Sequence, residues 1–368
     1  MKKSVIHIIT GLGSGGAERS LFSLLSGPCG TAFRHTVVSL TSDGTYGAKL
    51  RDFGIPVTSL DLKRMPWKLL SLPSFIRLQN ADIVQGWMYH GNLAAFFSSS
   101  RDVRLLWNVR HGLEDIYREK QTSKWVIQAN AMISARADKV IFNAEVSRKQ
   151  HIAIGFSQAN TQVIANGFDT NLFRFRASGR ARIRKECNIN DDALVVGHLG
   201  RFHPIKDHDT FLTAGRELLT SIPQTHLLLA GSGVEISSPF FRDNIPESLR
   251  TRVHLLGDRG DIPDILSAMD VFVQSSKAEG FPNVLGEAMS AGRACVATDV
   301  GDSALVLGDA GRIVASRNPS MLERSIRDIL TDPDYRAALG ELARAKVLRE
   351  FPIERTTDTY IELYRSLS

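Results

Sequence analysis

This sequence has few cysteines and no long apolar run. Its three cysteines, Cys29, Cys187 and Cys295, are odd in number and widely spaced, so they form neither a disulfide framework nor a zinc cluster. No stretch approaches the ~18 to 20 uninterrupted apolar residues that a membrane-spanning helix needs, and Met-Lys-Lys leads directly into a short apolar strand. These absences predict a cytoplasmic protein, neither secreted nor membrane-spanning.

The chain has enough apolar residues for more than one core. Hydrophobic residues make up 43% of its 368 residues and charged residues 23%. This composition is ordinary for a soluble globular protein and excludes disorder, collagen and repeat arrays. Because a single core usually stops growing before about 300 residues, we expect two domains.

The net charge of +6 is unevenly distributed along the chain. Residues 1–170 hold 20 Lys and Arg against 12 Asp and Glu, or +8, and residues 171–368 hold 25 against 27, or −2. A basic N-terminal half favours an anionic partner such as a phospholipid surface, a pyrophosphate-bearing acceptor or a nucleic acid. The alternative is a surface charge that only keeps the protein soluble.

A short basic and aromatic segment, Lys63-Arg64-Met65-Pro66-Trp67-Lys68, lies in this half. Tryptophan flanked by cations is typical of peripheral contact with an anionic membrane. A surface loop without a partner explains the same residues equally well, so membrane contact is a hypothesis for this segment.

Short apolar runs alternate with helix-length amphipathic segments, which is typical of βαβ units and parallel sheets. A turn signal at Asn166-Gly167-Phe168-Asp169 separates two such series. The expected strands are 5–9, 35–40, 55–60, 83–86, 104–109, 139–143, 162–164, 194–199, 226–230, 253–255, 271–274, 294–297 and 311–314. We therefore predict an α/β protein of two Rossmann-like, doubly wound parallel-sheet domains, residues 1–170 and 171–352. Their ligands should bind beyond the carboxyl ends of the strands.

A glycine-rich loop, Gly11-Leu12-Gly13-Ser14-Gly15-Gly16, follows the first strand and opens a helix. Its small residues let a ligand approach the backbone, and the N–H groups of the helix start favour an anion. The loop also satisfies Gly-x-Gly-x-x-Gly, which is a weak indication of dinucleotide binding. A tight turn that needs glycines only for its geometry is the alternative.

Two cations lie in the loop after the first strand of the second domain. Arg201 offers a planar fork and Lys206 a mobile point charge, which suits the two sides of a diphosphate; a surface charge pair is the alternative. We expect Asp207 or Asp209 to cap the next helix by accepting from its first N–H groups. The Asp-x-Asp pattern also suggests a metal site, but a bound metal ion would lie beside two cations, so capping is favoured. Gly231, after the following strand, either makes room for a ligand or simply forms a turn.

The stretch 279–289 is the most informative in the sequence. Gly280 and Pro282 keep the turn from being helical, and the residues that follow read as a helix start. Glu279 and Glu287 could accept hydrogen bonds from hydroxyls of a hexose and a ribose, while the N–H groups of the helix start receive phosphate oxygens. Two unrelated glutamates on a solvated helix are the alternative.

Together these motifs resemble the family-4 retaining glycosyltransferases of the GT-B fold, over essentially the whole chain. The first glycine loop is similar to that family's acceptor-side loop, and 166–169 to its interdomain turn. Gly200-Arg201 with Lys206 is similar to its phosphate clamp, and 279–287 to its Glu-x7-Glu motif. The resemblance implies two domains facing a cleft, with the acceptor on the first and the nucleotide-sugar on the second. It also implies a C-terminal helix, 353–367, that packs back on the first domain.

The resemblance further implies a role for each matching residue. Arg201 and Lys206 would bind the donor diphosphate, Glu287 the ribose and Glu279 the donor sugar. With Gly231 from its place after a strand, the expected donor site comprises Gly16, Arg201, Lys206, Gly231, Gly280, Phe281, Pro282, Asn283, Val284, Leu285 and Glu287. Gly286 departs from the family's pattern and would add flexibility within the helix that carries Glu287.

Two histidines follow strands of the first domain. His111, in Arg110-His111-Gly112, resembles the family's strand-end histidine near the reacting sugar and could orient a hydroxyl of the acceptor or donor. His90 could line the acceptor pocket, with packing or helix capping as equal alternatives. We expect Gly13, Gly15, Gly16, His90 and His111 to line the acceptor site, and Arg201, Lys206, Glu279 and His111 to form the catalytic group.

The resulting hypothesis is a retaining, metal-independent hexosyltransferase without a cofactor. It would move a sugar from a nucleotide-sugar, with UDP the expected nucleotide, to a carbohydrate or lipid-linked acceptor in surface polysaccharide or glycoconjugate synthesis. We expect it in the cytoplasm, with its basic half on an anionic membrane surface, and nucleic acid is not an expected partner. Two alternatives stay open: an NAD-dependent oxidoreductase, resting on the first glycine loop, and a non-catalytic sugar-nucleotide-binding subunit.

Overall fold

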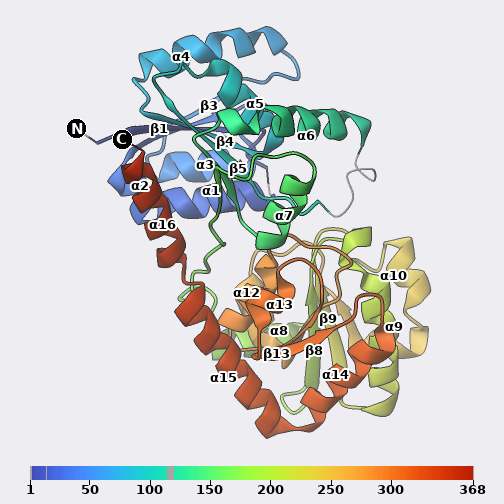
Figure 1. Cartoon of the computed structure of the whole chain (residues 1–368). Helices are drawn as coiled ribbons and strands as arrows, with labels where there is room; N and C mark the ends of the chain where they lie inside the picture. Colours follow the sequence, from blue (N-terminus) through green and yellow to red (C-terminus); the bar gives the residue numbers. More distant parts are fainter. Residues whose placement is uncertain (1, 14, 114–119, 368) are drawn as a thin grey trace. The chain divides into compact units, whose positions relative to one another are not determined.

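The computed structural model describes residues 2–13, 15–113 and 120–367, which divide into two compact units (Figure 1). Residues 1–167 with 353–368 make up the first unit, and residues 168–352 the second. The division after Gly167 lies within the turn predicted from the sequence, slightly before residue 170. Each unit contains one parallel sheet with helices on both faces, so the predicted α/β fold with two Rossmann-like domains is confirmed.

The first unit has a seven-stranded parallel sheet in the order β3-β2-β1-β4-β5-β6-β7. Its strands are β1 (Ser4–Ile9), β2 (Arg34–Ser39), β3 (Val57–Ser59), β4 (Ile83–Trp87), β5 (Arg104–Val109), β6 (Lys139–Phe142) and β7 (Thr161–Val163). The order reverses between β1 and β4, which makes these strands the switch point at which doubly wound sheets bind ligands.

Helices cover both faces of this sheet (Figure 1). One face packs on α4 (Leu72–Leu78), α5 (Met88–Ser98) and α6 (Gln121–Ile133), and the other on α1 (Gly16–Ser26), α2 (Pro28–Ala32), α3 (Gly44–Asp52) and α16 (Ile353–Ser366). The unit also contains η1 (Pro66–Ser71), η3 (Ser134–Arg136) and α7 (Glu145–Ala153). Because both faces are covered, β1 is buried along its whole length, as parallel strands are.

Helix α16 completes the core of the first unit. Its Tyr360 and Tyr364 are fully buried. The side-chain amide of Asn108 donates to the Tyr360 hydroxyl at 2.6 Å, and the Tyr364 hydroxyl donates to Gln85. Gln85 Oε1 on β4 and the Asn108 amide on β5 thus obtain partners from a helix more than 250 residues later in the chain, which lowers the cost of burying these polar groups.

The second unit has a six-stranded parallel sheet in the order β10-β9-β8-β11-β12-β13. Its strands are β8 (Leu194–Leu199), β9 (Thr225–Ala230), β10 (Val253–Leu255), β11 (Val271–Gln274), β12 (Ala294–Thr298) and β13 (Gly311–Val314). Every expected strand of the chain overlaps an observed one. The order reverses between β8 and β11, so these two strands form the switch point of the second sheet.

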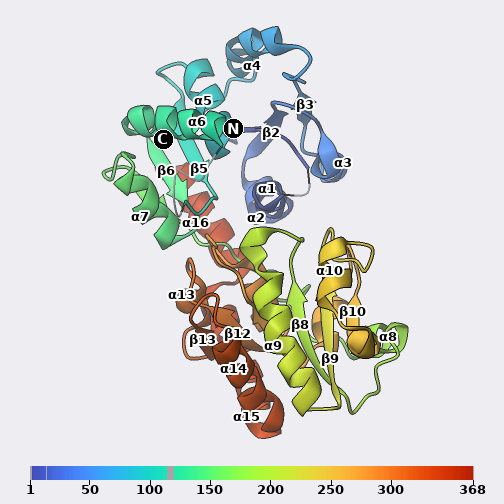
Figure 2. The ribbon, with the colours of Figure 1, turned by 90° about the vertical axis from the view of Figure 1, so that its right-hand side faces the viewer.

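The helices of the second unit also lie on both faces of its sheet. On one face α9 (His208–Ser221) and α14 (Pro319–Thr331) lie side by side (Figure 2). The remaining helices of the second unit, on either face, are α8 (Ala177–Glu186), η4 (Pro204–Lys206), α10 (Pro239–Asn244), η5 (Glu247–Arg252), α11 (Ile262–Ala268), α12 (Asn283–Ser290), α13 (Ser303–Leu307) and α15 (Pro333–Glu350). Within the described ranges, no helix of either unit is long and apolar enough to cross a membrane.

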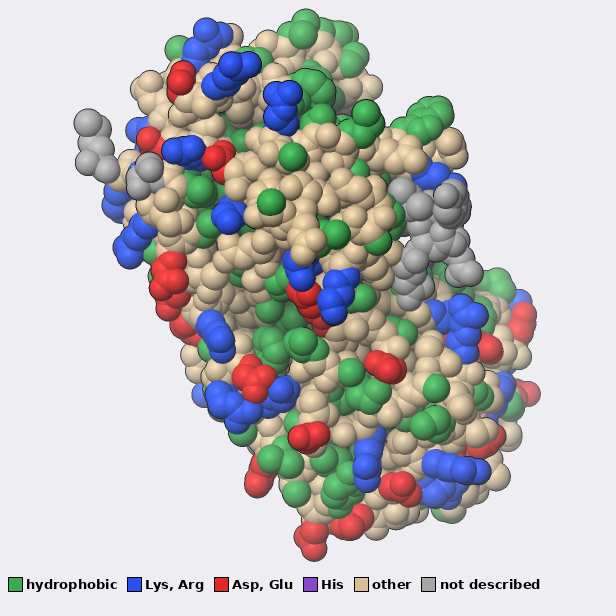
Figure 3. Space-filling model, in the orientation of Figure 1, with side chains coloured by type: hydrophobic (Ala, Val, Ile, Leu, Met, Phe, Trp, Pro, Cys, Tyr) green, Lys and Arg blue, Asp and Glu red, His purple; other side chains and the backbone are tan. Residues whose placement is uncertain are grey.

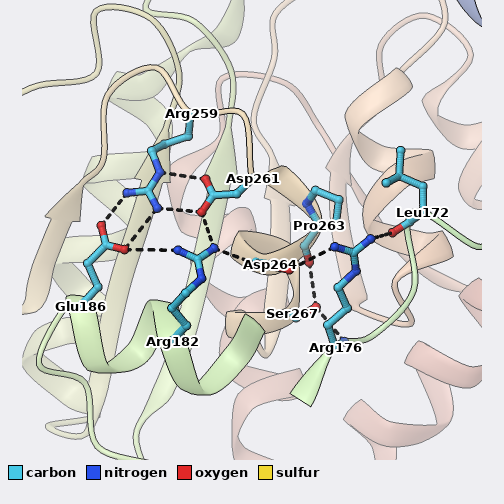
Figure 4. Close-up of polar contacts among 9 residues, drawn as sticks. All are labelled: Leu172, Arg176, Arg182, Glu186, Arg259, Asp261, Pro263, Asp264 and Ser267. Atoms are coloured by element: carbon cyan, nitrogen blue, oxygen red, sulfur yellow. Dashed lines mark hydrogen bonds and ion pairs between the residues drawn. The ribbon is translucent and has the colours of Figure 1, made fainter. Parts of the chain in front are cut away.

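A network of arginines and carboxylates ties α8 to the segment around α11 (Figure 4). Arg182 contacts Asp261 at 2.5 Å and Asp264 at 2.8 Å, and Arg259 bridges Asp261 and Glu186. The hydrogen bond from Arg259 is the main reason that the pKa of Asp261 lies far below its ordinary value. Because several charges share partners, the network holds α8 more firmly than isolated surface pairs do.

Candidate functional site

The loops that follow β8 and β11 meet at the switch point of the second sheet. The N–H of Lys277 donates to the carbonyl of Ile205 at 2.7 Å. The hydroxyl of Ser275 donates to the carbonyls of Lys206 and Asp207, at 3.1 Å each. These bonds join the loop predicted to carry the phosphate-binding cations to the loop that carries Glu279.

The two loops bring Lys206 and Glu279 into direct contact. The Lys206 Nζ lies 2.5 Å from Glu279 Oε1, and the Ser276 hydroxyl donates to the same oxygen at 2.7 Å. Both side chains are largely buried, with 25% of Lys206 and 13% of Glu279 exposed. Two residues predicted from separate motifs therefore form one ion pair, held in place by the serine that follows β11.

Arg201 follows the carboxyl end of β8 and is exposed. Its backbone position depends on Gly231, at the end of β9, which has φ +151°. A Cβ at Gly231 would lie 2.2 Å from the Gly200 oxygen and 2.8 Å from the Arg201 nitrogen. The N–H of Gly231 also donates to the Gly257 carbonyl at 2.7 Å. Gly231 thus lets two loops pack closely, while its predicted contact with a donor stays a prediction.

Asp207 does not cap α9 as the sequence predicted. It lies at the N-cap position with φ +49°, but its carboxylate makes no bond to the backbone there. Instead it accepts from the Thr210 hydroxyl at 2.7 Å and pairs with Lys277 at 2.9 Å. Asp209 is exposed. In the part of the chain that the structure describes, no group of three His, Cys, Asp or Glu side chains could hold a metal ion.

Two histidines that the sequence did not single out lie beneath the cationic loop. His198, on β8, and His208, at the start of α9, are buried with ring centroids 4.7 Å apart. Burial lowers the pKa of His208 to about 4 and that of His198 well below its ordinary value, and nearby Lys206 lowers both further. Both rings are therefore neutral near pH 7, and the positive charge of the loop comes from Arg201 and Lys206.

Helix α12 begins at Asn283, directly after Pro282, close to the predicted start. The N–H of Asn283 donates to the carbonyl of Phe281 at 3.0 Å. The amides of Val284 and Leu285 follow in the first turn, where helix N–H groups point toward the N-terminus and favour an anion. The Leu285 side chain lies fully in the core, so only its backbone can take part. The backbone of Gly280 is fixed by the N–H of Asp302, which donates to its carbonyl at 3.1 Å.

The glycine in the middle of α12 has a packing role. A Cβ at Gly286 would lie 2.0 Å from Cζ of Phe168. The Phe168 ring also stacks on Phe281, with centroids 6.1 Å apart and planes inclined by 23°. Glu287, the next residue along the helix, is only 4% exposed. The expected flexibility at Gly286 is thus corrected: the glycine lets an aromatic ring lie against the helix that carries Glu287.

The first glycine loop occupies the switch point of the other sheet. A Cβ at Gly13 or Gly16 would have no heavy atom within 4 Å, whereas one at Gly11 would lie 2.7 Å from Thr41 Oγ1. A Cβ at Gly15 would meet the Glu18 carboxylate at 2.4 Å. Open space at Gly13 and Gly16 is what a close ligand approach requires, while Gly11 serves the packing of the loop. Ser14 lies outside the described residues.

His111 follows β5 and is half-buried, whereas His90, on α5, is exposed. Nδ1 of His111 lies 3.3 Å from the hydroxyl of Tyr89, and that hydroxyl lies 2.7 Å from Nε2 of His151. The Ser147 hydroxyl donates to the carbonyl of His111 at 2.6 Å. The structure thus gives His111 two hydrogen-bond partners, Tyr89 from α5 and Ser147 from α7, and connects it through Tyr89 to His151.

Comparison with known proteins identifies the family. Residues 14–172 match the family model described as Glycosyltransferase Family 4, and residues 193–332 match the model described as Glycosyl transferases group 1. The lipopolysaccharide core biosynthesis mannosyltransferase LpcC of Rhizobium leguminosarum bv. viciae is 31% identical over 260 residues, which cover 68% of each chain. The chain belongs to the family-4 glycosyltransferases. The resemblance seen in the motifs is confirmed.

Other relatives of this family-4 glycosyltransferase match over shorter stretches. The UDP-Gal:alpha-D-GlcNAc-diphosphoundecaprenol alpha-1,3-galactosyltransferase of Escherichia coli is 28% identical over 207 residues, 55% of this chain and 53% of that one. The chain spans about half the length of several curated relatives that it matches. Among solved structures, Anabaena HepE in complex with UDP has a TM-score of 0.85 and 23% identity over the whole of both chains, which shows the same GT-B fold.

Proposed function

We propose that this family-4 glycosyltransferase transfers a sugar, with retention of configuration, from a UDP-sugar to a carbohydrate or lipid-linked acceptor in surface polysaccharide or glycoconjugate synthesis. The observation that carries the proposal is the contact of Lys206 with Glu279 at the switch point of the second sheet. The names of relatives support the substrate classes: a UDP-galactose-dependent enzyme acting on a lipid diphosphate, and a lipopolysaccharide mannosyltransferase.

In this proposal the Lys206–Glu279 pair is the resting form of the donor site. A diphosphate offers Lys206 more negative charge than one carboxylate does, so the ammonium turns to the phosphate oxygens when the donor binds. Glu279 then accepts hydrogen bonds from sugar hydroxyls, and the exposed Arg201 takes the second side of the diphosphate. The first amides of α12 receive phosphate oxygens, and Glu287 binds the ribose.

The chemistry follows from where charge develops. As the bond between the sugar and the β-phosphate breaks, negative charge grows on the departing UDP, and Arg201, Lys206 and the start of α12 stabilise it without a metal. The acceptor hydroxyl attacks from the same face, and its proton passes to an oxygen of the leaving β-phosphate. No protein nucleophile is invoked in this front-face mechanism.

The acceptor side of the proposal lies in the first unit. Gly13 and Gly16 leave open space beside β1, and His111, aligned by Tyr89, orients a hydroxyl of the acceptor or donor. His90 is exposed on α5, where it could contact only a ligand bound at that surface.

An anionic membrane surface is the proposed location of the acceptor. Three apolar side chains of η1 are exposed, Trp67 by 63%, Leu69 by 39% and Leu70 by 82%, beside the cations of segment 63–68. In Figure 3, hydrophobic and basic side chains lie together over the region of α4 that follows η1. Apolar side chains that enter the headgroup region and cations that meet anionic lipid are what peripheral binding requires.

The first experiment is a donor screen on the purified chain. We expect UDP to raise the unfolding temperature and NAD to leave it unchanged, with about 2.7 kcal/mol of added stability at a hundred times the Kd. UDP-, GDP- and ADP-sugars are then compared for binding, hydrolysis and transfer. Binding of NAD in place of UDP would refute the proposal, and UDP-sugar binding without hydrolysis or transfer would identify a non-catalytic subunit.

Two variants test the roles within the site. Arg201→Ala and Lys206→Ala should each lower transfer by about a hundredfold or more, because each removes a cation from the developing charge. The matched control is Lys185→Ala, which removes an exposed lysine at the end of α8. Near-normal turnover in both site variants would exclude the assigned phosphate-binding role.

A further inference from the structure

A chain of hydrogen bonds connects His111 to the buried His151 through Tyr89. The Tyr89 hydroxyl lies 3.3 Å from His111 Nδ1 and 2.7 Å from His151 Nε2. Nδ1 of His151 lies 2.7 Å from the carbonyl oxygen of Ser147. All four residues belong to the first unit, and His151 is completely buried among Phe142, Phe156 and the Tyr89 ring.

The hydrogen-bond partners of His151, Tyr89 and His111 determine which of their ring nitrogens and hydroxyl groups donate. A carbonyl oxygen only accepts, so Nδ1 of His151 carries a hydrogen. Burial lowers the pKa of His151 to about 4, so near pH 7 its ring is neutral and Nε2 holds a lone pair. The Tyr89 hydroxyl must therefore donate to His151. Its oxygen then accepts, and the group at 3.3 Å that can donate to it is Nδ1–H of His111.

We propose that Tyr89 and His151 are positioning residues that hold His111 in the tautomer with hydrogen on Nδ1, so that Nε2 accepts a hydrogen bond from a substrate hydroxyl. The assignment of the substrate hydroxyl rests on the proposed function; the tautomer itself does not. A histidine held in this way accepts the hydrogen of a substrate hydroxyl, whereas a ring protonated on Nε2 would donate to the hydroxyl oxygen instead.

The backbone of the residues that form these hydrogen bonds is also held in place. Met88, just before Tyr89, has φ +63°, a conformation that costs energy for a residue with a side chain. It lies where β4 passes into α5, and Tyr89 is 7% exposed while the next residue is exposed. The amide of Asn130 donates to the Tyr89 carbonyl at 3.1 Å, and the Ser147 hydroxyl donates to the His111 carbonyl at 2.6 Å. Residues of α5, α6 and α7 thus fix the surroundings of His111, which is what precise alignment of its ring requires.

The tautomer can be read directly by NMR of the full chain labelled with 15N-histidine. Long-range 1H–15N spectra distinguish a protonated from an unprotonated ring nitrogen, and His111→Gln identifies the His111 signals by their loss. We expect wild-type His111 to be protonated on Nδ1 near pH 7.5 and Tyr89→Phe to shift it toward Nε2. Tyr335→Phe removes a hydroxyl from the second unit and serves as the matched control. Protonation of wild-type His111 on Nε2, or no shift in Tyr89→Phe, would overturn the proposal.

Kinetics supply the second readout. Tyr89→Phe keeps the ring that stacks on His151, so the fold and the Kd for UDP should be unchanged while kcat falls about tenfold or more. His151→Gln should give the same pattern if it remains folded. A lower kcat with an unchanged His111 tautomer would refute the positioning role. If the tautomer behaves as expected in a chain that transfers no sugar, the proposed function fails and the assignment of the proton stands.

Discussion

Replacing Gly286 by alanine tests how closely α12 is packed against Phe168. The added Cβ would lie 2.0 Å from Cζ of Phe168 and 2.2 and 2.7 Å from two further ring carbons. To reach an ordinary contact of about 3.4 Å the ring must retreat by more than an ångström. Its retreat is opposed by Phe281, which stacks on it and itself packs edge-on against Phe351. The strain therefore falls on α12, which carries Glu287.

The size of the effect follows from two opposing terms. Overpacking a core typically costs about 1–3 kcal/mol, and three ring carbons in contact place Gly286→Ala at the upper end. Alanine returns about 0.5–1 kcal/mol, because it is the better helix former. We expect a net loss of about 2 kcal/mol, which for a unit of this size corresponds to a Tm lower by about 4–8 °C.

The assay is chemical and thermal unfolding of the variant, with UDP affinity measured in parallel. Gly260→Ala is the matched control, because a Cβ there would have no heavy atom within 4 Å. Phe168→Leu removes the tip of the ring, so its combination with Gly286→Ala should be less destabilised than the sum of the two single variants. Wild-type stability in Gly286→Ala, or simple additivity in the double variant, would refute this account of the packing.

Three further predictions address charge. Glu279→Gln removes the partner of Lys206, so isothermal titration should show UDP binding a few-fold more tightly while transfer falls at least about tenfold; weaker UDP binding would contradict the resting pair. Burial lowers the pKa of His35 to about 4, so the folded state resists a proton that the unfolded chain takes up below pH 6.5. His35 alone should account for about 2 kcal/mol of the stability lost between pH 7 and pH 5. In denaturant unfolding, His35→Asn should therefore lose about 2 kcal/mol less than the wild type over that range. Lys63, Arg64 and Lys68 changed together to glutamine should abolish flotation with anionic vesicles, and flotation equal to that of the wild type would exclude the membrane role.

Local pattern was enough to predict the fold and the loops of the candidate site. Because parallel strands are buried on both faces, they read as short apolar runs, and the observed strands lie where those runs are. The loops after β8 and β11 could be predicted as ligand-binding loops, because their charged residues lie shortly after the ends of these strands. The start of α12 was also predicted, because Pro282 ends the turn.

Contacts between distant residues could not be predicted in this way. Lys206 and Glu279 are 73 positions apart, and only the strand order reveals that their loops adjoin. Gly286 was interpreted as flexible, because nothing in the local sequence reveals that Phe168, far earlier in the chain, fills the space beside it. His151 belongs to no recognisable sequence motif. Its contact with Tyr89, 62 positions earlier and on a different helix, becomes visible only in the structure.

The position of α16 has a consequence for how the molecule is made. The first unit buries Tyr360 and Tyr364 in its core, yet both are synthesised after the whole of residues 168–352. On the ribosome, the second unit can therefore complete its fold while the first still exposes the surface that α16 will cover. During that interval the side chains of Gln85 and Asn108 lack the tyrosine hydroxyls that they contact in the finished structure. The first unit, although most of it is translated first, can complete its core only after the second unit has been synthesised.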